Sequence, residues 1–132
     1  MNPLATMIAV CALAAGGTLP DPACTPGKVA AVSLQQLCDH SYERTRKVSS
    51  ALKRKTFTEY GLDIRKVKGA WEVDHLVPRC LGGADVIENL WPEQNYQEKD
   101  QIEARVCREV CGQRRGLEKA RDAFKTDWRT LR

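Results

Sequence analysis

The feature that most constrains the fold is a pair of short segments, 71–77 and 89–91, separated by a loop with two consecutive glycines. Segment 71–77 is rich in β-forming residues, so we expect a strand there. Pro78 lacks a hydrogen-bond donor and should end this strand, and Pro92 should end a second strand at 89–91. The sequence therefore predicts a hairpin with an unusually long loop, and long ordered loops are often functional.

Four segments around this hairpin have the spacing and caps of helices. Ser33 is a candidate N-cap of the first, Ser49 or Ser50 of the second, and Asn95 of the third. The expected helices are 29–38, 48–61, 95–111 and 117–131. A two-stranded hairpin packed with helices is an α+β fold, and a chain of 132 residues is long enough for one such domain.

The N-terminus has the character of an export signal. Residues 1–20 carry no charged side chain, and the apolar run 4–15 ends in small residues. The run is too short to cross a bilayer, which takes roughly 20 apolar residues. We therefore expect a cleaved signal peptide at 1–20, a flexible lead-in at 21–32 and one domain at 33–132. The mature protein would be secreted or periplasmic, with no membrane association beyond the signal peptide.

The chain has six cysteines, which can form the cross-links that stabilise a protein with a small core. Five of them lie beyond the predicted signal peptide. In an oxidising compartment such cysteines are expected in disulfides. Because five is odd, either one thiol is left over or Cys11 is retained in the mature chain. Cys107 and Cys111 lie four residues apart and share a helix face, so each should bond elsewhere. No Cys-x-x-Cys pair occurs, which argues against paired zinc knuckles.

Charge is distributed unevenly along the chain, although the formal net charge is only +4. Segment 44–68 has nine basic residues against two acidic, 72–103 has eight acidic against two basic, and 105–132 has nine basic against four acidic. Basic flanks could neutralise phosphates while an acidic centre holds a divalent cation. Lys53 and Arg54, on the predicted second helix, are candidate nucleic-acid contacts, and a solvated helix face is an equally good explanation of them.

Four short motifs follow one another in the hairpin and the helix after it. They are Asp74-His75-x-x-Pro78, Leu81-Gly82-Gly83, Asn89-Leu90-Trp91-Pro92 and Lys99-Asp100. Together they resemble the HNH endonucleases, also called His-Me finger or ββα-metal nucleases, and above all small exported bacterial members. Further matches to that group are Cys38, Tyr60-Gly61, Val106-Cys107 and Asp127-Trp128. The resemblance covers roughly residues 28 to 130. It implies a ββα-metal finger and a phosphodiester hydrolase.

The resemblance also implies roles for three of these residues. Hydrolysis needs an activated water and a cation beside the developing charge. His75, whose neutral imidazole can accept a proton near pH 7, would be the general base. Asp74 would hold the metal, since its carboxylate is a hard oxygen ligand. Asn89 would orient the His75 loop. The implied cofactor is a divalent ion, Mg²⁺ or else Mn²⁺ or Zn²⁺. The implied partner is nucleic acid, with DNA favoured over RNA as the alternative, bound by a monomer.

The chain departs from the family at the third signature position, because the helix after the hairpin has no histidine. Asn95 as metal ligand and Lys99 as phosphate or transition-state contact are the candidates there, with Glu98 competing for the metal. Arg79 lies close enough in sequence to contact a phosphate, and a surface salt bridge is its alternative. If no side chain completes the metal site, the protein would be an inactive nucleic-acid-binding protein with the same fold.

Two further expectations concern pairing and geometry. The resemblance implies a disulfide between Cys38 and Cys107, and Cys80 would then pair with Cys24 or Cys111. Adjacent side chains of a regular strand point to opposite faces, so the Asp-His pair can form one site only if the strand ends or twists there.

Overall fold

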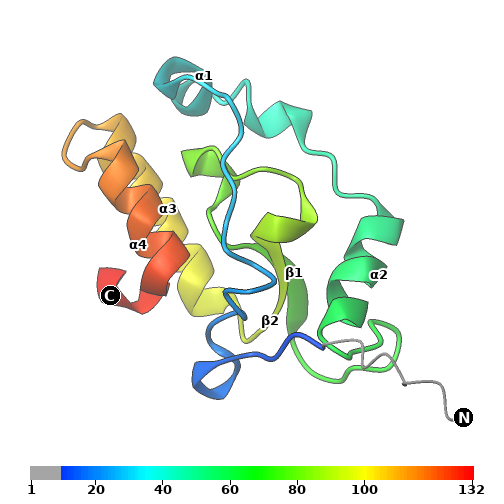
Figure 1. Ribbon diagram of the computed structural model, residues 1–132. Coiled ribbons are helices and arrows are strands. Elements are labelled where there is room, and N and C mark those ends of the chain that lie inside the picture. Colours follow the sequence, from blue (N-terminus) through cyan, green and yellow to red (C-terminus); the bar gives the residue numbers. More distant parts are fainter. Residues whose placement is uncertain (1–9) are drawn as a thin grey trace, which may run out of the picture.

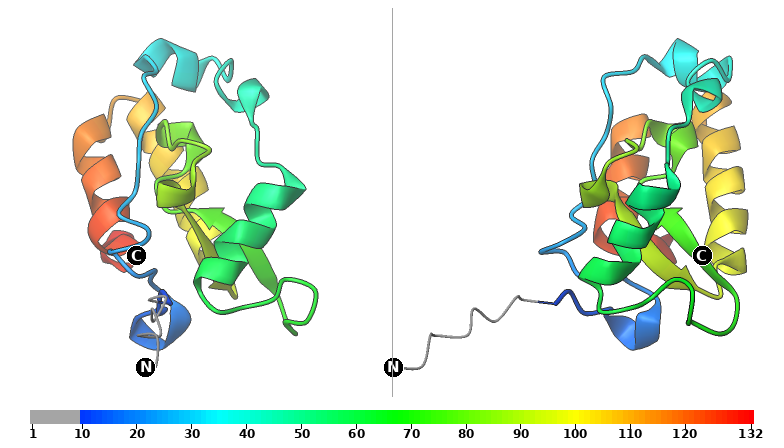
Figure 2. Two further views of the ribbon diagram at one scale, coloured as in Figure 1. Left: turned by 45° about the vertical axis from the view of Figure 1, so that its right-hand side comes forward. Right: turned by 90° about the vertical axis from the view of Figure 1, so that its right-hand side faces the viewer.

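The computed structural model describes residues 10–132, which form an α+β domain around a two-stranded antiparallel hairpin. The helices are α1 (Leu34–Cys38), α2 (Ser50–Glu59), α3 (Gln97–Cys111) and α4 (Leu117–Asp127), and the strands are β1 (Trp71–His75) and β2 (Leu90–Gln94). The hairpin lies between α2 on one side and the paired helices α3 and α4 on the other (Figures 1 and 2). The predicted fold class is confirmed at this level.

The hairpin differs from its prediction at both strands. β1 ends at His75, so Leu76 and Val77 belong to the loop. β2 continues past Pro92, which lies opposite Val73. A proline is tolerated where its missing N–H would face away from the partner strand, and in a two-stranded sheet each strand has one unpartnered edge. The prediction that Pro92 ends the strand is therefore wrong.

Serine caps begin the first two helices as predicted. The Ser33 hydroxyl accepts a hydrogen bond from the Gln36 N–H at 3.2 Å, and the Gln36 side chain accepts one from the Ser33 N–H at 2.9 Å. This reciprocal pair is a capping box. The Ser49 hydroxyl accepts from the Leu52 N–H at 3.1 Å, so Ser49 rather than Ser50 is the N-cap of α2.

The two C-terminal helices depart from their predicted bounds. Asn95 does not cap α3, which begins at Gln97 without a side-chain cap. Its φ of 57° is left-handed, a conformation that asparagine tolerates, and its N–H donates to the Ala70 carbonyl at 2.9 Å. Asn95 therefore forms the turn between β2 and α3, and the predicted cap is wrong. The predicted helix 117–131 is also interrupted, because α4 stops at Asp127 and a 3₁₀ turn follows.

One apolar cluster joins α3, α4 and the loop after β1. Its buried members are Val77, Leu81, Ile102, Val106, Val110, Ala120, Phe124, Trp128 and Leu131. A smaller cluster gathers Trp91 and Leu76 with Tyr60 from the end of α2 and with Cys11. The hairpin and its loop therefore contribute to both parts of the core, which holds the loop after His75 in place.

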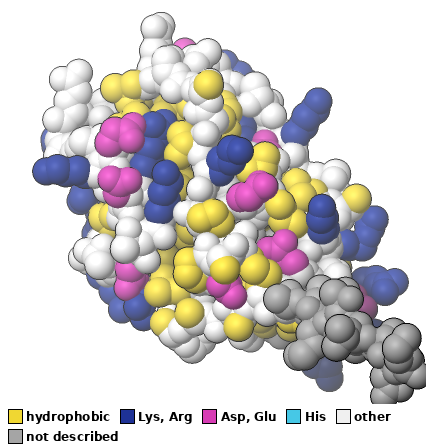
Figure 3. All heavy atoms as spheres, viewed as in Figure 1, with side chains coloured by type: hydrophobic (Ala, Val, Ile, Leu, Met, Phe, Trp, Pro, Cys, Tyr) yellow, Lys and Arg dark blue, Asp and Glu magenta, His cyan; other side chains and the backbone are white. Residues whose placement is uncertain are grey.

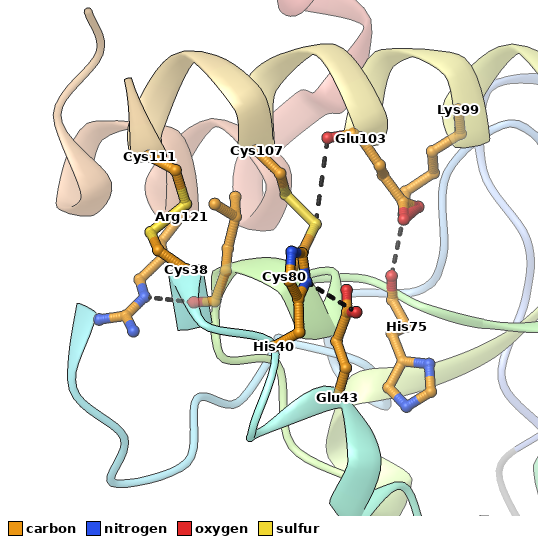
Figure 4. Close-up of a disulfide and its surroundings, with 11 residues drawn as sticks. Cys38, His40, Glu43, His75, Cys80, Lys99, Glu103, Cys107, Cys111 and Arg121 are labelled. Atoms are coloured by element: carbon orange, nitrogen blue, oxygen red, sulfur yellow. Dashed lines mark hydrogen bonds and ion pairs between the residues drawn. A yellow bond between two sulfur atoms is a disulfide. The ribbon is translucent and has the colours of Figure 1, made fainter. Parts of the chain in front are cut away.

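Three disulfides staple the domain: Cys11–Cys24, Cys38–Cys111 and Cys80–Cys107. The predicted Cys38–Cys107 bond is wrong, and so are both partners proposed for Cys80. Cys107 and Cys111 do bond elsewhere, as their shared helix face required. Figure 4 shows both bonds leaving the same side of α3. Cys38 of α1 bonds to Cys111 in the last turn of this helix, whereas Cys80, in the loop after β1, bonds to Cys107 one turn earlier.

The N-terminal segment packs against the domain from Val10 onward. The Cys11 N–H donates to the Glu59 carbonyl at 2.8 Å, and the Trp128 indole donates to the Thr18 carbonyl at 2.8 Å. The first nine residues of the predicted signal peptide lie outside the described residues, and its cleavage stays a prediction. Further along, Ala30 donates to the Gly82 carbonyl at 2.8 Å, which joins the predicted lead-in to the glycine loop.

Three disulfides are typical of an oxidising environment, as in the periplasm or outside the cell. Among residues 10–132, no helix is both long and apolar enough to cross a bilayer.

Candidate functional site

A polar hollow of about 280 Å³ opens between the end of β1, the loop that follows it and α3. We call it the acidic pocket. Asp74 and His75 both line it, although their side chains leave opposite faces of β1. They meet because β1 has an unpartnered edge and ends at His75, so that the pocket wraps around the strand end. The geometric requirement raised by the sequence is met.

His75 is held in one orientation by Asp85, a residue that the sequence reasoning missed. The imidazole Nε2 lies 2.8 Å from Asp85 Oδ1, and both side chains are largely buried. A carboxylate accepts the Nε2–H hydrogen, which leaves Nδ1 as the acceptor nitrogen. Burial, assisted by the charge of Arg46, lowers the pKa of His75. A neutral imidazole at pH 7 with a free Nδ1 is competent to accept a proton.

Asp85 is itself fixed by two donors. Its Oδ2 accepts from the Arg79 guanidinium at 2.7 Å and from the Lys47 N–H at 2.8 Å. Burial alone would raise the pKa of Asp85, but the hydrogen bonds from Lys47 and His75 and the Arg79 charge outweigh it and lower the pKa. Asp85 therefore remains an anion beside the imidazole. The available sequence signal was an acidic residue in the loop, two positions after the second glycine.

Arg79 lies at the wall of the acidic pocket, and three of its five N–H donors have partners within residues 10–132. Besides Asp85, the guanidinium donates to the Tyr42 carbonyl at 2.6 Å and to the Thr45 hydroxyl at 3.2 Å. It also lies 4.3 Å from the centre of the Tyr42 ring, and the residue is only 8% exposed. In this arrangement Arg79 supports Asp85, and its predicted contact with a phosphate stays a prediction.

Asn89 fastens the loop that follows His75. Its carboxamide oxygen accepts from the Val77 N–H at 3.0 Å and from the Lys28 N–H at 3.3 Å. Its amide group donates to the carbonyls of Val77 and Ala84, both at 3.1 Å. The side chain is fully buried and does not line the pocket. Asn89 is thus a positioning residue, remote from any substrate.

Lys99 is fully buried between β1 and α3 and makes three contacts. Its Nζ lies 2.7 Å from Asp74 Oδ2. It also lies 2.8 Å from Glu103 Oε1 and 2.9 Å from the His75 carbonyl oxygen, and Figure 4 shows Lys99 between these two residues. An ammonium group has three hydrogens, so none is left for a phosphate. Burial alone would lower the pKa of Lys99, but Asp74 and Glu103 raise it and keep the group charged. Lys99 therefore anchors the site instead of contacting substrate.

Five carboxylates surround this single lysine. In two groups that share Asp74, one oxygen from each side chain lies within 4.8 Å of the others. The groups are Glu72, Asp74 and Glu93, and Asp74, Asp100 and Glu103. Burial, and after it the Asp74 charge, raises the pKa of Glu72 to about 8 and that of Glu93 to about 9. One Glu93 oxygen is buried without a hydrogen-bond partner. Such a set of hard oxygen donors fits a divalent cation.

Helix α3 contributes carboxylates to the acidic pocket, where the sequence analysis expected the amide of Asn95 as metal ligand. Asp100 and Glu103 line the acidic pocket with Asp74, whereas Asn95 is exposed in the turn and lies outside it. Glu98 is exposed and pairs with Arg132. A signal was present in the sequence: position 103 lies one helical turn after both Lys99 and Asp100.

The predicted nucleic-acid contacts on α2 are exposed, and Figure 3 shows basic side chains gathered along the edge that carries this helix. Lys53 lines a hollow next to the acidic pocket, whereas Arg54 lines a different one. Arg46, which the sequence reasoning did not single out, lines both the acidic pocket and its neighbour. None of the ion pairs among residues 10–132 involves Arg46 or Lys53.

Comparison of the chain with models of protein families, with curated proteins and with solved structures gives no match.

Proposed function

We propose that this chain is a metal-dependent endonuclease of the HNH class that hydrolyses phosphodiester bonds in nucleic acid, DNA rather than RNA. The observation that carries the proposal is the convergence on one pocket of His75, fixed by Asp85, with the carboxylates of Asp74, Asp100 and Glu103. A proton acceptor beside a set of hard oxygen ligands is what metal-assisted hydrolysis of a phosphodiester requires. On this proposal, the hairpin and α3 form a ββα-metal finger.

In the proposed reaction, His75 Nδ1 accepts a proton from the attacking water, and Asp85 stabilises the imidazolium that forms. Asp74, Asp100 and Glu103 would hold the cation. When bound, Mg²⁺, or else Mn²⁺ or Zn²⁺, supplies positive charge beside the phosphate oxygens. Arg46, the unpaired cation at the pocket, takes the phosphate contact that the sequence had given to Arg79 and Lys99.

A second candidate is a non-catalytic nucleic-acid-binding protein of the same fold. The observation that favours it is Lys99, whose ammonium already pairs with two carboxylates of the cation group, Asp74 and Glu103. A protein that keeps this pairing would have little need of a metal ion. The two candidates differ in whether divalent binding depends on Asp74.

The decisive experiment is nicking of supercoiled plasmid by the purified oxidised protein with a panel of Mg²⁺, Mn²⁺, Zn²⁺ and Ca²⁺. Activity should require a divalent ion, disappear with EDTA and disappear in His75→Ala. His40→Ala is the matched control, because the His40 side chain is exposed and its ion-pair partner within residues 10–132 is Glu43, at 3.2 Å. Equal cleavage by wild type and His75→Ala would exclude the proposed mechanism.

Calorimetric titration with Mn²⁺ separates the two candidates when no cleavage is seen. Wild type should bind the ion and Asp74→Asn should not, with Asp122→Asn on α4 as an exposed control. Absence of any Asp74-dependent binding supports the non-catalytic protein. The proposed environment is the periplasm or the medium, and the proposed active form is a monomer.

A further inference from the structure

A second hollow, of about 410 Å³, adjoins the acidic pocket. It lies between α2, the connector at 62–70 and β1, and we call it the tryptophan hollow. The two share Arg46, Glu72 and Val73 in their walls, so they lie side by side on the surface. Its volume falls within the range of about 300–1,000 Å³ that is usual for small-molecule sites.

The wall of this hollow carries an aromatic ring held in a fixed position. The Trp71 indole N–H donates to the Lys68 carbonyl at 2.9 Å. On its other side the ring packs against the buried Phe57, with the ring centres 6.0 Å apart and the planes tilted by 58°. Ile64 and Val67 add apolar wall. A partly exposed aromatic ring that is fixed in advance can stack a planar heterocycle without losing rotamer freedom on binding.

The charged side chains of the hollow favour an anion. Arg46 and Lys53 are both exposed, and neither takes part in an ion pair within residues 10–132. Glu72 is the acidic residue in the lining, and it lies on the side shared with the acidic pocket. A ligand with a flat apolar group and an adjacent negative charge therefore matches this surface. A nucleotide has both.

We propose that the tryptophan hollow is a subsite for an unpaired nucleobase, which stacks on Trp71 while Arg46 binds the phosphate leading into the acidic pocket. The inference rests on the proposed nuclease function and gives it a substrate class. In a duplex both faces of a base are covered by its neighbours, so only a single-stranded segment can present a base to the ring. The preferred substrate is thus single-stranded nucleic acid or an unpaired stretch within a duplex.

Tryptophan fluorescence tests this directly, because Trp91 and Trp128 are only 0% and 3% exposed and quenching by a ligand reports Trp71. The probe is a short oligothymidylate, titrated in EDTA into the full chain carrying His75→Ala, so that no cleavage interferes. It should quench the signal, and a duplex of the same length should bind at least about tenfold more weakly. Equal binding of the two probes would overturn the proposal.

Substitutions then assign the contact, with affinity measured by anisotropy of a labelled oligothymidylate. Trp71→Ala should weaken binding about tenfold, equivalent to about 1.4 kcal/mol. Trp71→Phe keeps a ring and should stay within about threefold of wild type, which also guards against a folding defect. Arg46→Gln should weaken binding, whereas Lys119→Gln, on exposed α4, should not. Unchanged affinity in Trp71→Ala, or equal losses in Arg46→Gln and Lys119→Gln, would refute the subsite.

The subsite and the catalytic proposal fail in different ways. If the oligonucleotide binds through Trp71 but the wild type cleaves nothing with any metal, the subsite stands and catalysis fails. If the wild type cleaves single and double strands equally and Trp71→Ala cleaves as well as wild type, catalysis stands and the subsite fails. A hollow that instead seats an aromatic peptide would give no quenching by oligothymidylate, which counts against the proposal.

Discussion

The imidazole of His75 and the carboxylate of Asp85 lie 2.8 Å apart, although the two residues are ten positions apart in the sequence. The pair selects one tautomer, because Nε2 must carry the hydrogen that Asp85 accepts. The second oxygen of the Asp85 carboxylate accepts a hydrogen bond from Arg79, which leaves the carboxylate little freedom to move away from the imidazole. Any proton transfer at Nδ1 therefore depends on a residue that need not touch the substrate.

Asp85→Asn should lower kcat about 10- to 100-fold with a smaller change in KM, the usual effect of removing a partner that orients a functional group. An amide can present its NH₂ group to Nε2 and so favour the tautomer with hydrogen on Nδ1. The measurement is steady-state cleavage of a single-stranded oligonucleotide. Asp122→Asn is the control, since that carboxylate is exposed on α4. A kcat within twofold of wild type would show that the tautomer is fixed by something else.

Without a divalent ion, the protein should lose stability as the pH rises from about 5 to 9. Burial, followed by repulsion from neighbouring carboxylates, raises the pKa of Glu103 to about 7, of Glu72 to about 8 and of Glu93 to about 9. The folded protein therefore keeps protons that the unfolded chain releases above about pH 5, and the stabilisation they provide disappears as these groups ionise.

Thermal unfolding in EDTA checks this, and Mg²⁺ or Ca²⁺ should raise Tm more at about pH 9 than at about pH 6, because ionised carboxylates bind the ion. Glu93→Gln should flatten the pH dependence of Tm. Glu118→Gln, at an exposed position on α4, should leave the pH dependence of Tm unchanged. A Tm that rises steadily over this range in EDTA would contradict the prediction.

Replacing Cys80 and Cys107 together by serine should cost activity as well as stability. The bond closes a segment of 27 residues, for which chain-entropy estimates give about 3–4 kcal/mol, and it ties the loop after His75 to the helix that carries Glu103. Replacing Cys38 and Cys111 should cost at least as much stability, since their separation is 73 residues, but should spare the activity of the folded fraction. Urea unfolding and cleavage assays give the two readouts. Equal activity of both folded variants would remove the special role of the Cys80–Cys107 bond.

Asn89→Ala should destabilise the protein by about 2–4 kcal/mol, because it leaves buried donors and acceptors of Val77 and Ala84 without partners. Urea unfolding measures this. Gln101→Ala, on the exposed face of α3, should change stability by less than about 0.5 kcal/mol. A cost for Asn89→Ala as small as that of the control would mean that the loop is held by other contacts.

Local signals in the sequence predicted what local interactions decide. Ser33 and Ser49 cap helices, β-forming residues make up β1, and the glycine loop separates the strands, each within a few neighbouring positions. The meeting of Asp74 and His75 in one pocket also followed from a local cause, the early end of the strand.

The remaining features depend on the position of α3 along the hairpin, and no local sequence pattern specifies that position. That register decides whether Cys38 meets Cys107 or Cys111, and it buries Lys99 against Asp74. It also brings Asp100 and not Asn95 to the acidic pocket. Lys99 lies in a polar stretch, and nothing in that stretch indicates that it is fully buried. Burial of its charge is tolerated only where carboxylates from another element surround it, and the local sequence does not show those carboxylates.

The Cys11–Cys24 bond has a consequence for the length of the exported chain. A peptidase cut after Ala14, made before this bond forms, would remove Cys11 and leave the Cys24 thiol without its partner, with five cysteines in the mature protein. That thiol could then join two copies covalently, and the monomer would become a dimer sensitive to reductant. A cut before Val10 would instead keep all three bonds within one chain.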